Sequence, residues 1–147
     1  TAGGGNDVAL GGQGVDTINL GAGTNVIIGD AGRITGYGSG AGLDTLELTL
    51  NTITSTDPTV GGGDIITANA GSDYIVGGTG DDQITATDGS LAPDVIFGDH
   101  AQIKFRVAVA GDTIPVVLAA RSAFITLGGN DTIVRCQMLA RPSQSRS

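Results

Sequence analysis

The sequence predicts an all-β fold in which short parallel strands stack into a β-roll or β-helix, with longer strands or hairpins inserted. Three observations favour this fold class. Glycine accounts for 26 of the 147 residues and aromatic residues for only 3%, so a core of large aromatic side chains is excluded. Apolar residues still make up 39% of the chain, and they recur at regular intervals. A nine-residue pattern also repeats along the chain, which predicts stacked structural units.

Charge and motif content exclude several classes of function. The formal net charge is −8, and residues 1–100 contain 13 of the 15 acidic residues but only one base, Arg33, so nucleic acid is not expected as a partner. No apolar run is long enough to span a membrane. The motifs of zinc proteases, serine hydrolases and P-loop proteins are missing, so we do not expect an enzyme. Cys136 is the only cysteine, so an extracellular chain would rely on metal ions for stability rather than on disulfides.

The nine-residue pattern is G-G-x-G-x-D-x-U-x, where U is apolar. It is complete at residues 11–19 (GGQGVDTIN) and 77–85 (GGTGDDQIT). Weaker copies lie at residues 2–10, 20–28, 39–47, 68–76 and 127–134. This array resembles the RTX, or hemolysin-type, calcium-binding nonapeptide repeat. The resemblance implies a β-roll that binds several Ca²⁺ ions in its turns.

The residue types within one repeat give a physical reason for such a fold. Glycine adopts φ > 0 at little steric cost, so the segment G-G-x-G-x-D can reverse the chain tightly and turn its carbonyl groups inward. The other three residues form a short strand whose middle side chain, such as that of Ile84, faces the interior. Two units close one coil, and neighbouring coils stack about 4.8 Å apart. Residues 18 apart, such as Asp64 and Asp82 or Asp7 and Asn25, should therefore lie above one another.

Stacked carboxylates predict a metal site, because they repel one another unless a cation lies between them. A hard ion bound by carboxylate and carbonyl oxygens is most naturally Ca²⁺. The predicted side-chain ligands are Asp7, Asp16, Asn25, Asp64, Asp73, Asp82, Asp94 and Asp131. The predicted glycines of the metal turns are Gly11, Gly12, Gly14, Gly77, Gly78 and Gly80. For each Gly-x-Asp the alternative is a plain turn, and Asp44 is a weaker candidate because the coil after it is interrupted. Asn25 lacks the charge, and Ile34 takes the next expected position, so the metal row should weaken there.

A longer repeat divides residues 1–134 into two modules of about 67 residues. Residues 59–67 (TVGGGDIIT) return as 126–134 (TLGGNDTIV), and residues 29–34 (GDAGRI) return as 98–103 (GDHAQI). Nonapeptide turns occupy residues 2–28 and 59–97, and strand-rich inserts occupy residues near 34–58 and 103–126. The alternating apolar residues of these inserts are Leu46, Leu48, Leu50, Ile103, Phe105, Val107 and Val109. Such alternation is typical of strands with one buried face. Residues 135–147 form a basic C-terminal tail.

Four further polar residues are expected to carry no chemistry. His100 is the only histidine and takes the place of Ala31 in the first module. This position predicts a solvent-facing loop residue rather than a catalytic base. Asp81, Asp88 and Asp99 are expected to be solvated turn residues.

Three classes of function remain for such a chain. The preferred one is a structural or adhesive repeat protein, a subunit or segment of a fibre, surface layer or giant adhesin at the bacterial cell surface. The mixed modules resemble those of very large bacterial secreted or surface proteins. The second class is the calcium-dependent carrier or secretion module of an RTX enzyme or toxin. The third is a carbohydrate-binding or ice-binding module, with a cell-surface polysaccharide as partner, although outward threonines are scattered.

The expected partners are copies of the same chain or adjacent modules, associated head to tail. The end coil of a solenoid presents unpaired strand edges, which need to be covered. A repeat already begins at residue 2, with no polar cap before it. The basic tail at residues 135–147 would then lie on an acidic surface of the next unit.

Overall fold

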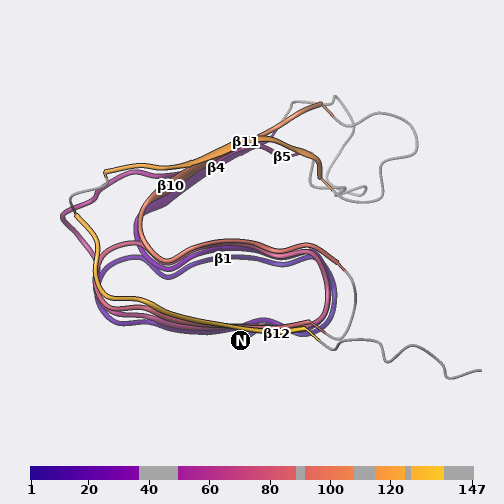
Figure 1. Ribbon diagram of the computed structural model, residues 1–147, viewed down its shortest axis with the longest axis horizontal. Coiled ribbons are helices and arrows are strands. Elements are labelled where there is room, and N and C mark those ends of the chain that lie inside the picture. Colours follow the sequence, from indigo (N-terminus) through magenta and orange to yellow (C-terminus); the bar gives the residue numbers. More distant parts are fainter. Residues whose placement is uncertain (37–49, 89–91, 108–114, 125–126, 138–147) are drawn as a thin grey trace, which may run out of the picture.

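The computed structural model describes residues 1–36, 50–88, 92–107, 115–124 and 127–137 (Figure 1). Within these ranges the chain forms twelve strands and no helix, so the prediction of an all-β fold is confirmed. No helix of the described residues is long and apolar enough to cross a membrane. The strands form three four-stranded sheets rather than one continuous parallel solenoid. We call them sheets A, B and C.

Sheets A and B are parallel and are built from short strands. Sheet A has the order β1 (Val8–Leu10), β3 (Val26–Ile28), β7 (Tyr74–Val76) and β9 (Val95–Phe97). Sheet B has the order β2 (Thr17–Asn19), β6 (Ile65–Ala68), β8 (Gln83–Asp88) and β12 (Thr132–Gln137). The chain crosses from sheet A to sheet B and back, so each pair of strands, such as β1 and β2, completes one coil. Four coils stack in this way, and their traces superpose in Figure 1.

Sheet C is antiparallel and is formed by two excursions of the chain. Its order is β11 (Val117–Ser122), β10 (Ala101–Phe105), β5 (Leu50–Ser55) and β4 (Gly32–Gly36). β4 and β5 lie between β3 and β6 in the chain, and β10 and β11 lie between β9 and β12. The excursions therefore start only from the second and fourth coils. The spacing of strands explains this alternation, because each excursion adds two strands and so covers the width of two coils.

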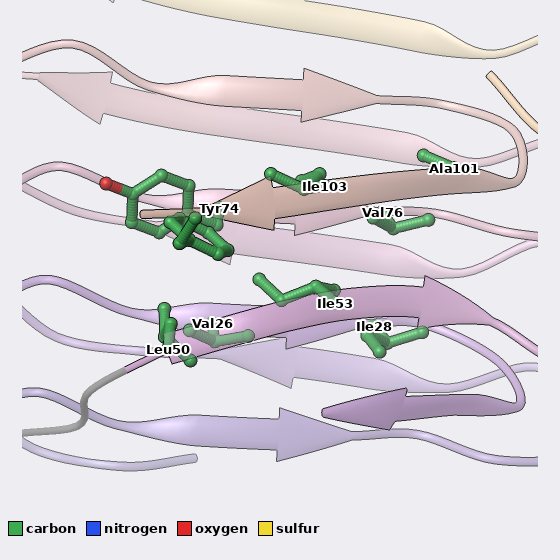
Figure 2. Packing of buried hydrophobic residues seen from close by; sticks show 9 residues of the cluster. Val26, Ile28, Leu50, Ile53, Tyr74, Val76, Ala101 and Ile103 are labelled. Atoms are coloured by element: carbon green, nitrogen blue, oxygen red, sulfur yellow. The ribbon is translucent and has the colours of Figure 1, made fainter. Parts of the chain in front are cut away.

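The apolar core has two parts, one on each face of sheet A. Toward sheet C, Val26, Ile28, Tyr74 and Val76 pack with residues of β5 and β10, as Figure 2 shows. Toward sheet B, the packed residues are Ile18, Leu20, Ile27, Ile66, Ala68, Ile75, Ile84 and Ala86. Sheet A is thus the middle of three layers (Figure 1). All three residues of β3 and of β7 are buried, whereas an isolated roll would bury only the middle one.

The insert predictions are confirmed only in part. Ile103 and Phe105 are buried and Lys104 between them is exposed, as the alternation predicts. The prediction for Val107 is wrong, because β10 ends at Phe105 and the Val107 side chain is 57% exposed. Leu50 is buried at the start of β5. The remaining predictions there, for Leu46, Leu48 and Val109, fall outside the described residues, as does Asp44.

The C-terminal boundary also differs from the expected one. β12 continues to Gln137 and pairs with β8 throughout its length, so the ladder reaches three residues into the predicted tail. Residues 138–147 lie outside the described part of the chain.

Candidate metal site

A first aspartate row lies along the turns that lead from sheet A to sheet B. It consists of Asp16, Asp64, Asp82 and Asp131, one from each coil. The main-chain N–H of Asp16 donates to Oδ1 of Asp64 at 2.8 Å, and that of Asp64 donates to Oδ1 of Asp82 at 2.7 Å. The N–H of Asp82 donates in the same way to Asp131 at 3.0 Å. The predicted stacking of Asp64 on Asp82, 18 residues apart, is confirmed.

The first row is not interrupted at Ile34, where the sequence suggested that it would weaken. Ile34 was the next expected position after Asp16, but it lies in β4 of the excursion. Asp64 takes that place instead, 48 residues from Asp16. The reason is that residues 31–60 leave the coil and return to it, so the count of 18 holds only for uninterrupted coils.

A second row lies along the opposite turns, from sheet B to sheet A. It consists of Asp7, Asn25, Asp73 and Asp94. Each main-chain N–H donates to the side-chain Oδ1 of the next member, at 3.1, 3.0 and 3.1 Å in that order. All eight predicted side chains therefore lie in one of two rows. The two rows are separate, because they occupy different turns of each coil.

The second carboxylate oxygen, Oδ2, has the same surroundings in four of the row aspartates. Oδ2 of Asp7, Asp16, Asp64 and Asp82 is buried and receives no hydrogen bond within the described structure. Burial raises the pKa of Asp64 to about 6 and that of Asp82 to about 7, and neighbouring carboxylates add to both shifts. A buried carboxylate is costly as an anion unless a positive charge compensates it. At neutral pH the buried carboxyl groups of Asp64 and Asp82 are therefore stabilised by either a proton or a cation.

The first glycine of each turn in the first row leaves room for a cluster of oxygen atoms. A Cβ added at Gly29 would overlap Oδ2 of Asp64 and the carbonyl oxygen of Gly77. A Cβ added at Gly77 would overlap Oδ2 of Asp82 and the carbonyl oxygen of Gly98. A carboxylate oxygen and a main-chain carbonyl oxygen thus lie beside each of these glycines. Oxygen atoms of these two kinds are the ligands of a hard cation.

The remaining turn glycines are needed for their backbone conformation. Gly12 and Gly14 have φ of 106° and 93°, and Gly78 and Gly80 have φ of 126° and 103°. Residues with a Cβ rarely adopt such angles. The predicted metal-turn glycines therefore lie in the turns that end at Asp16 and Asp82.

The contacts of Nδ2 of Asn25 show which groups surround the side-chain atom that corresponds to Oδ2 of an aspartate. Its Nδ2 donates to the carbonyl oxygens of Gly21 at 3.1 Å and Gly23 at 3.3 Å, and to Oδ1 of Asp73 at 2.9 Å. Its Oδ1 accepts the N–H of Asp7, which fixes the orientation of the amide. The predicted role of Asn25 as a metal ligand does not fit this geometry. Its amide group already donates to the oxygen atoms that a cation would contact.

No site made of side chains alone is present in the described ranges, since no three His, Cys, Asp or Glu side chains there converge on one point. Each turn places one row member beside the main chain. A bound cation would therefore be completed by carbonyl oxygens. This arrangement suits Ca²⁺, which accepts backbone carbonyl ligands, better than it suits a transition metal.

Three polar residues, His100, Asp99 and Asp88, differ from their predicted surroundings. Asp88 is the last residue of strand β8 rather than a turn residue. The prediction of a solvent-facing His100 is wrong: the residue is buried, and its ring packs edge-on against Phe124 with centroids 5.7 Å apart. His100 directly precedes β10, and its Nε2 lies 3.3 Å from Oγ1 of Thr79, a contact that the alignment with Ala31 did not reveal. Asp99 is only half-exposed and accepts the N–H of Gly129 at 3.0 Å. Asp81 is exposed, as predicted, but accepts the N–H of Asn130 at 2.8 Å.

Asp30 is a buried acid that the sequence reasoning missed. It is 1% exposed and accepts hydrogen bonds from the main-chain N–H groups of Gly62 and Thr79. The available signal was the Gly-Asp pair at residues 29–30, which returns at residues 98–99.

Comparisons of the sequence with known proteins agree with this geometry. A family model described as the RTX calcium-binding nonapeptide repeat matches four copies, over residues 1–33 and 59–90. Neither the curated proteins nor the solved structures gave a significant match. The two matched segments lie on either side of residues 34–58, most of the first excursion, and they contain the turns that end at Asp16, Asp64 and Asp82. The chain therefore contains RTX calcium-binding nonapeptide repeats, in residues 1–33 and 59–90.

Proposed function

We propose that this chain is a calcium-stabilised structural module of an extracellular bacterial protein, and that sheets A and B form an RTX β-roll. Ca²⁺ binds in the aspartate turns between neighbouring coils, at Asp16, Asp64 and Asp82 of the first row and at Asp7 of the second. The observation that carries the proposal is the buried Oδ2 atom of each of these residues, which receives no hydrogen bond within the described structure.

The comparison with Asn25 strengthens this assignment. Asn25 donates to the carbonyl oxygens four and two residues before it. Gly12 and Gly14 hold the same positions before Asp16. An Asp side chain replaces the amide nitrogen by a carboxylate oxygen, so Oδ2 of Asp16 would face carbonyl oxygens. A bound cation supplies the positive charge that removes this repulsion.

Two single substitutions, Asp to Asn in the first row and Asn to Asp in the second, test the proposal. Asp82→Asn should lose one bound Ca²⁺ ion and keep its fold, because the amide can donate to the turn carbonyls as Asn25 does. Asn25→Asp should gain one ion. Equilibrium dialysis with metal analysis gives the number of ions per chain. Asp57→Asn is the control, because Asp57 is exposed, lies outside both rows, and its carboxylate accepts hydrogen bonds from Thr59. An unchanged number of ions in Asp82→Asn would contradict the assignment.

The raised pKa values predict how the metal-free chain responds to pH. The folded-state pKa values of Asp64 and Asp82, about 6 and about 7, lie above the ordinary value of 3.8. Their contribution to stability is therefore complete below about pH 4 and is lost as the pH rises through 6 and 7. With calcium removed, far-UV circular dichroism should show more β-structure at pH 5 than at pH 8. Equal β-content at both values would count against protons and calcium occupying the same sites.

The wider role we propose is that of a repeat unit in a fibre, surface layer or adhesin, with copies or adjacent modules stacked head to tail. Sheet A has β1 and β9 as edge strands, and sheet B has β2 and β12. The inner strands of both sheets pair in parallel on both sides. A further coil with the same strand spacing could extend these ladders.

The charge on sheet C favours polysaccharide binding as a second candidate function. Every basic residue whose side chain the structure describes lies on this sheet or directly after β10: Arg33, Lys104, Arg106 and Arg121. The strands of sheet C contain no acidic residue. Register aligns Arg33, Thr54, Gln102 and Arg121 in one row across all four strands. Arg121 also donates to Oε1 of Gln102 at 3.0 Å, which orients its guanidinium.

A linear anionic polysaccharide carries charge complementary to this face. Binding of heparin, a sulfated polysaccharide, should weaken about tenfold or more when Arg33, Lys104 and Arg121 are all changed to Gln, whereas neutral dextran should not bind either protein. The control keeps the charge, with Arg33→Lys and Arg121→Lys, and should retain most of the affinity. All proteins are compared in the same calcium buffer. Equal heparin affinity of the Gln variant and the parent would exclude this face as the binding surface.

A further inference from the structure

Two of the four turns in the first aspartate row are built from two separate pieces of chain. The turns at residues 11–16 and 77–82 are continuous. In the second coil the turn begins at Gly29 and Asp30, the chain leaves for the excursion at residues 31–60, and the turn resumes at residues 61–64. In the fourth coil it begins at Gly98 and Asp99 and resumes at residues 128–131. These split turns end at Asp64 and Asp131.

The same hydrogen bond joins the two halves of each split turn. Oδ1 of Asp30 accepts the N–H of Gly62 at 3.2 Å, and Oδ1 of Asp99 accepts the N–H of Gly129 at 3.0 Å. Gly62 and Gly129 are equivalent, because each lies two residues before the row member of its turn. The bond therefore recurs in both split turns, although the excursions between their two halves differ in sequence and length.

Close packing accompanies this hydrogen bond in both turns. A Cβ added at Gly61 would overlap the carboxylate of Asp30, and one added at Gly128 would overlap that of Asp99. In the continuous turns the position of Asp30 and Asp99 is held by Gly12 and Gly78. The acid thus occurs where the peptide chain is interrupted, and glycine occurs where it is continuous.

Asp30 also links its turn to the neighbouring continuous turn. Its Oδ2 accepts the N–H of Thr79, which lies in the turn that ends at Asp82. Both oxygens of Asp30 are therefore used by main-chain donors, whereas Oδ2 of Asp64 receives no hydrogen bond. The two buried acids of this turn have different surroundings and so different roles.

We propose that Asp30 and Asp99 are positioning residues that hold the two halves of the split calcium turns together. Each hydrogen bond takes the place of the missing chain continuity and fixes Asp64 or Asp131 for the ion. The inference rests on the proposed calcium binding and extends it to the fourth turn, where Asp131 lies in the first row and a Cβ added at Gly98 would overlap its Oδ2. It also makes the excursions part of the calcium site, because a split turn is complete only when its excursion has brought the second half back.

The test compares variants at Asp99 by calcium titration, with ¹H–¹⁵N NMR to follow each turn separately. The amide of Asp131 reports the split turn, and the amide of Asp16 reports a continuous turn. Asp99→Ala should weaken calcium binding at the split turn about tenfold or more and change the continuous turn by less than about twofold. Asp99→Asn keeps the acceptor Oδ1 and should restore affinity to within about threefold of the parent.

The matched control is Asp81→Ala. Asp81 also accepts a main-chain N–H in the fourth turn, that of Asn130, but it lies in a continuous turn and its bond joins no interrupted chain. Asp81→Ala should leave the calcium affinities of the split turn and of the continuous turn near those of the parent. Parent-like binding in Asp99→Ala would overturn the proposal. So would an Asp99→Asn protein as weak as Asp99→Ala, because the charge would then act directly on the ion.

A measurement on the parent protein covers the case in which Asp99→Ala does not fold. In the calcium-loaded chain the amides of Gly62 and Gly129 should exchange slowly with solvent, because each is held by a carboxylate. Rapid exchange of both would overturn the proposal. A parent that shows no calcium-dependent shift in any turn would instead overturn the proposed calcium function.

Discussion

Removal of calcium at neutral pH should unfold the two parallel sheets, and its return should restore them. The first row places Asp16, Asp64 and Asp82 on successive coils, each with a buried Oδ2 that no donor reaches in the described structure. Without a cation these carboxylates repel one another in a narrow core. The binding free energy of the ions is therefore part of the folding free energy.

Far-UV circular dichroism at pH 7.5, with and without EDTA, measures this effect. The β-signal should fall in EDTA and return when calcium reaches about 10⁻⁴ to 10⁻³ M, the range of extracellular calcium modules. Mg²⁺ at the same concentration is the control, because it is smaller and keeps its water ligands, so it should restore little structure. Full β-content in excess EDTA at this pH would show that the rows need no metal.

A chain with these affinities would stay unfolded in a cytosol and fold outside the cell. Cytosolic calcium is too scarce to occupy sites in the millimolar range, whereas extracellular calcium is sufficient. This behaviour agrees with RTX repeats, which are typical of secreted proteins.

Local periodicity made much of the site predictable. The count of 18 residues from Asp64 to Asp82 reflects two nine-residue units with nothing inserted, and the structure places these residues in adjacent coils. The same count failed after Asp16, because the next coil contains an excursion and its row member lies 48 residues away. Spacing therefore predicts contacts only within an uninterrupted stretch of repeats.

Pairing between the excursions could not be predicted from the sequence. β5 and β10 come from different excursions and pair to form the centre of sheet C. That pairing buries the flanking residues of β3 and β7. The predicted strand pattern was correct at Ile103, but it gave no indication of which strands would meet.

The sequence pattern also could not predict that the side chain of Asn25 donates hydrogen bonds within its turn. Asn25 lies in the row where the repeat predicts it, but its amide donates to the carbonyl oxygens of Gly21 and Gly23. The repeated Gly-Asp pair was visible at residues 29–30 and 98–99. The structure places each pair at the end of the first half of a split turn, which the sequence pattern did not indicate.

Ile84→Ala should lower the free energy of unfolding by about 2–5 kcal/mol, measured in urea with saturating calcium. Ile84 is fully buried in β8, where it packs in the cluster between sheets A and B. In the coil that contains Ile84 a short turn at residues 77–82 connects β7 of sheet A directly to β8 of sheet B, which limits how far the two sheets can move together to fill the cavity. A site that cannot collapse loses both the buried surface and the contacts around the void.

Ile65→Ala is the matched control, because Ile65 belongs to the same sheet but its side chain is 46% exposed. It should cost less than about 1 kcal/mol. Saturating calcium is required for both, since weaker ion binding would otherwise add its own contribution to the apparent stability. Neither variant removes a ligand, so both should bind as many ions as the parent. If the two substitutions destabilised the chain equally, the contacts between sheets A and B would not be the main source of stability, and the ions would have to supply it.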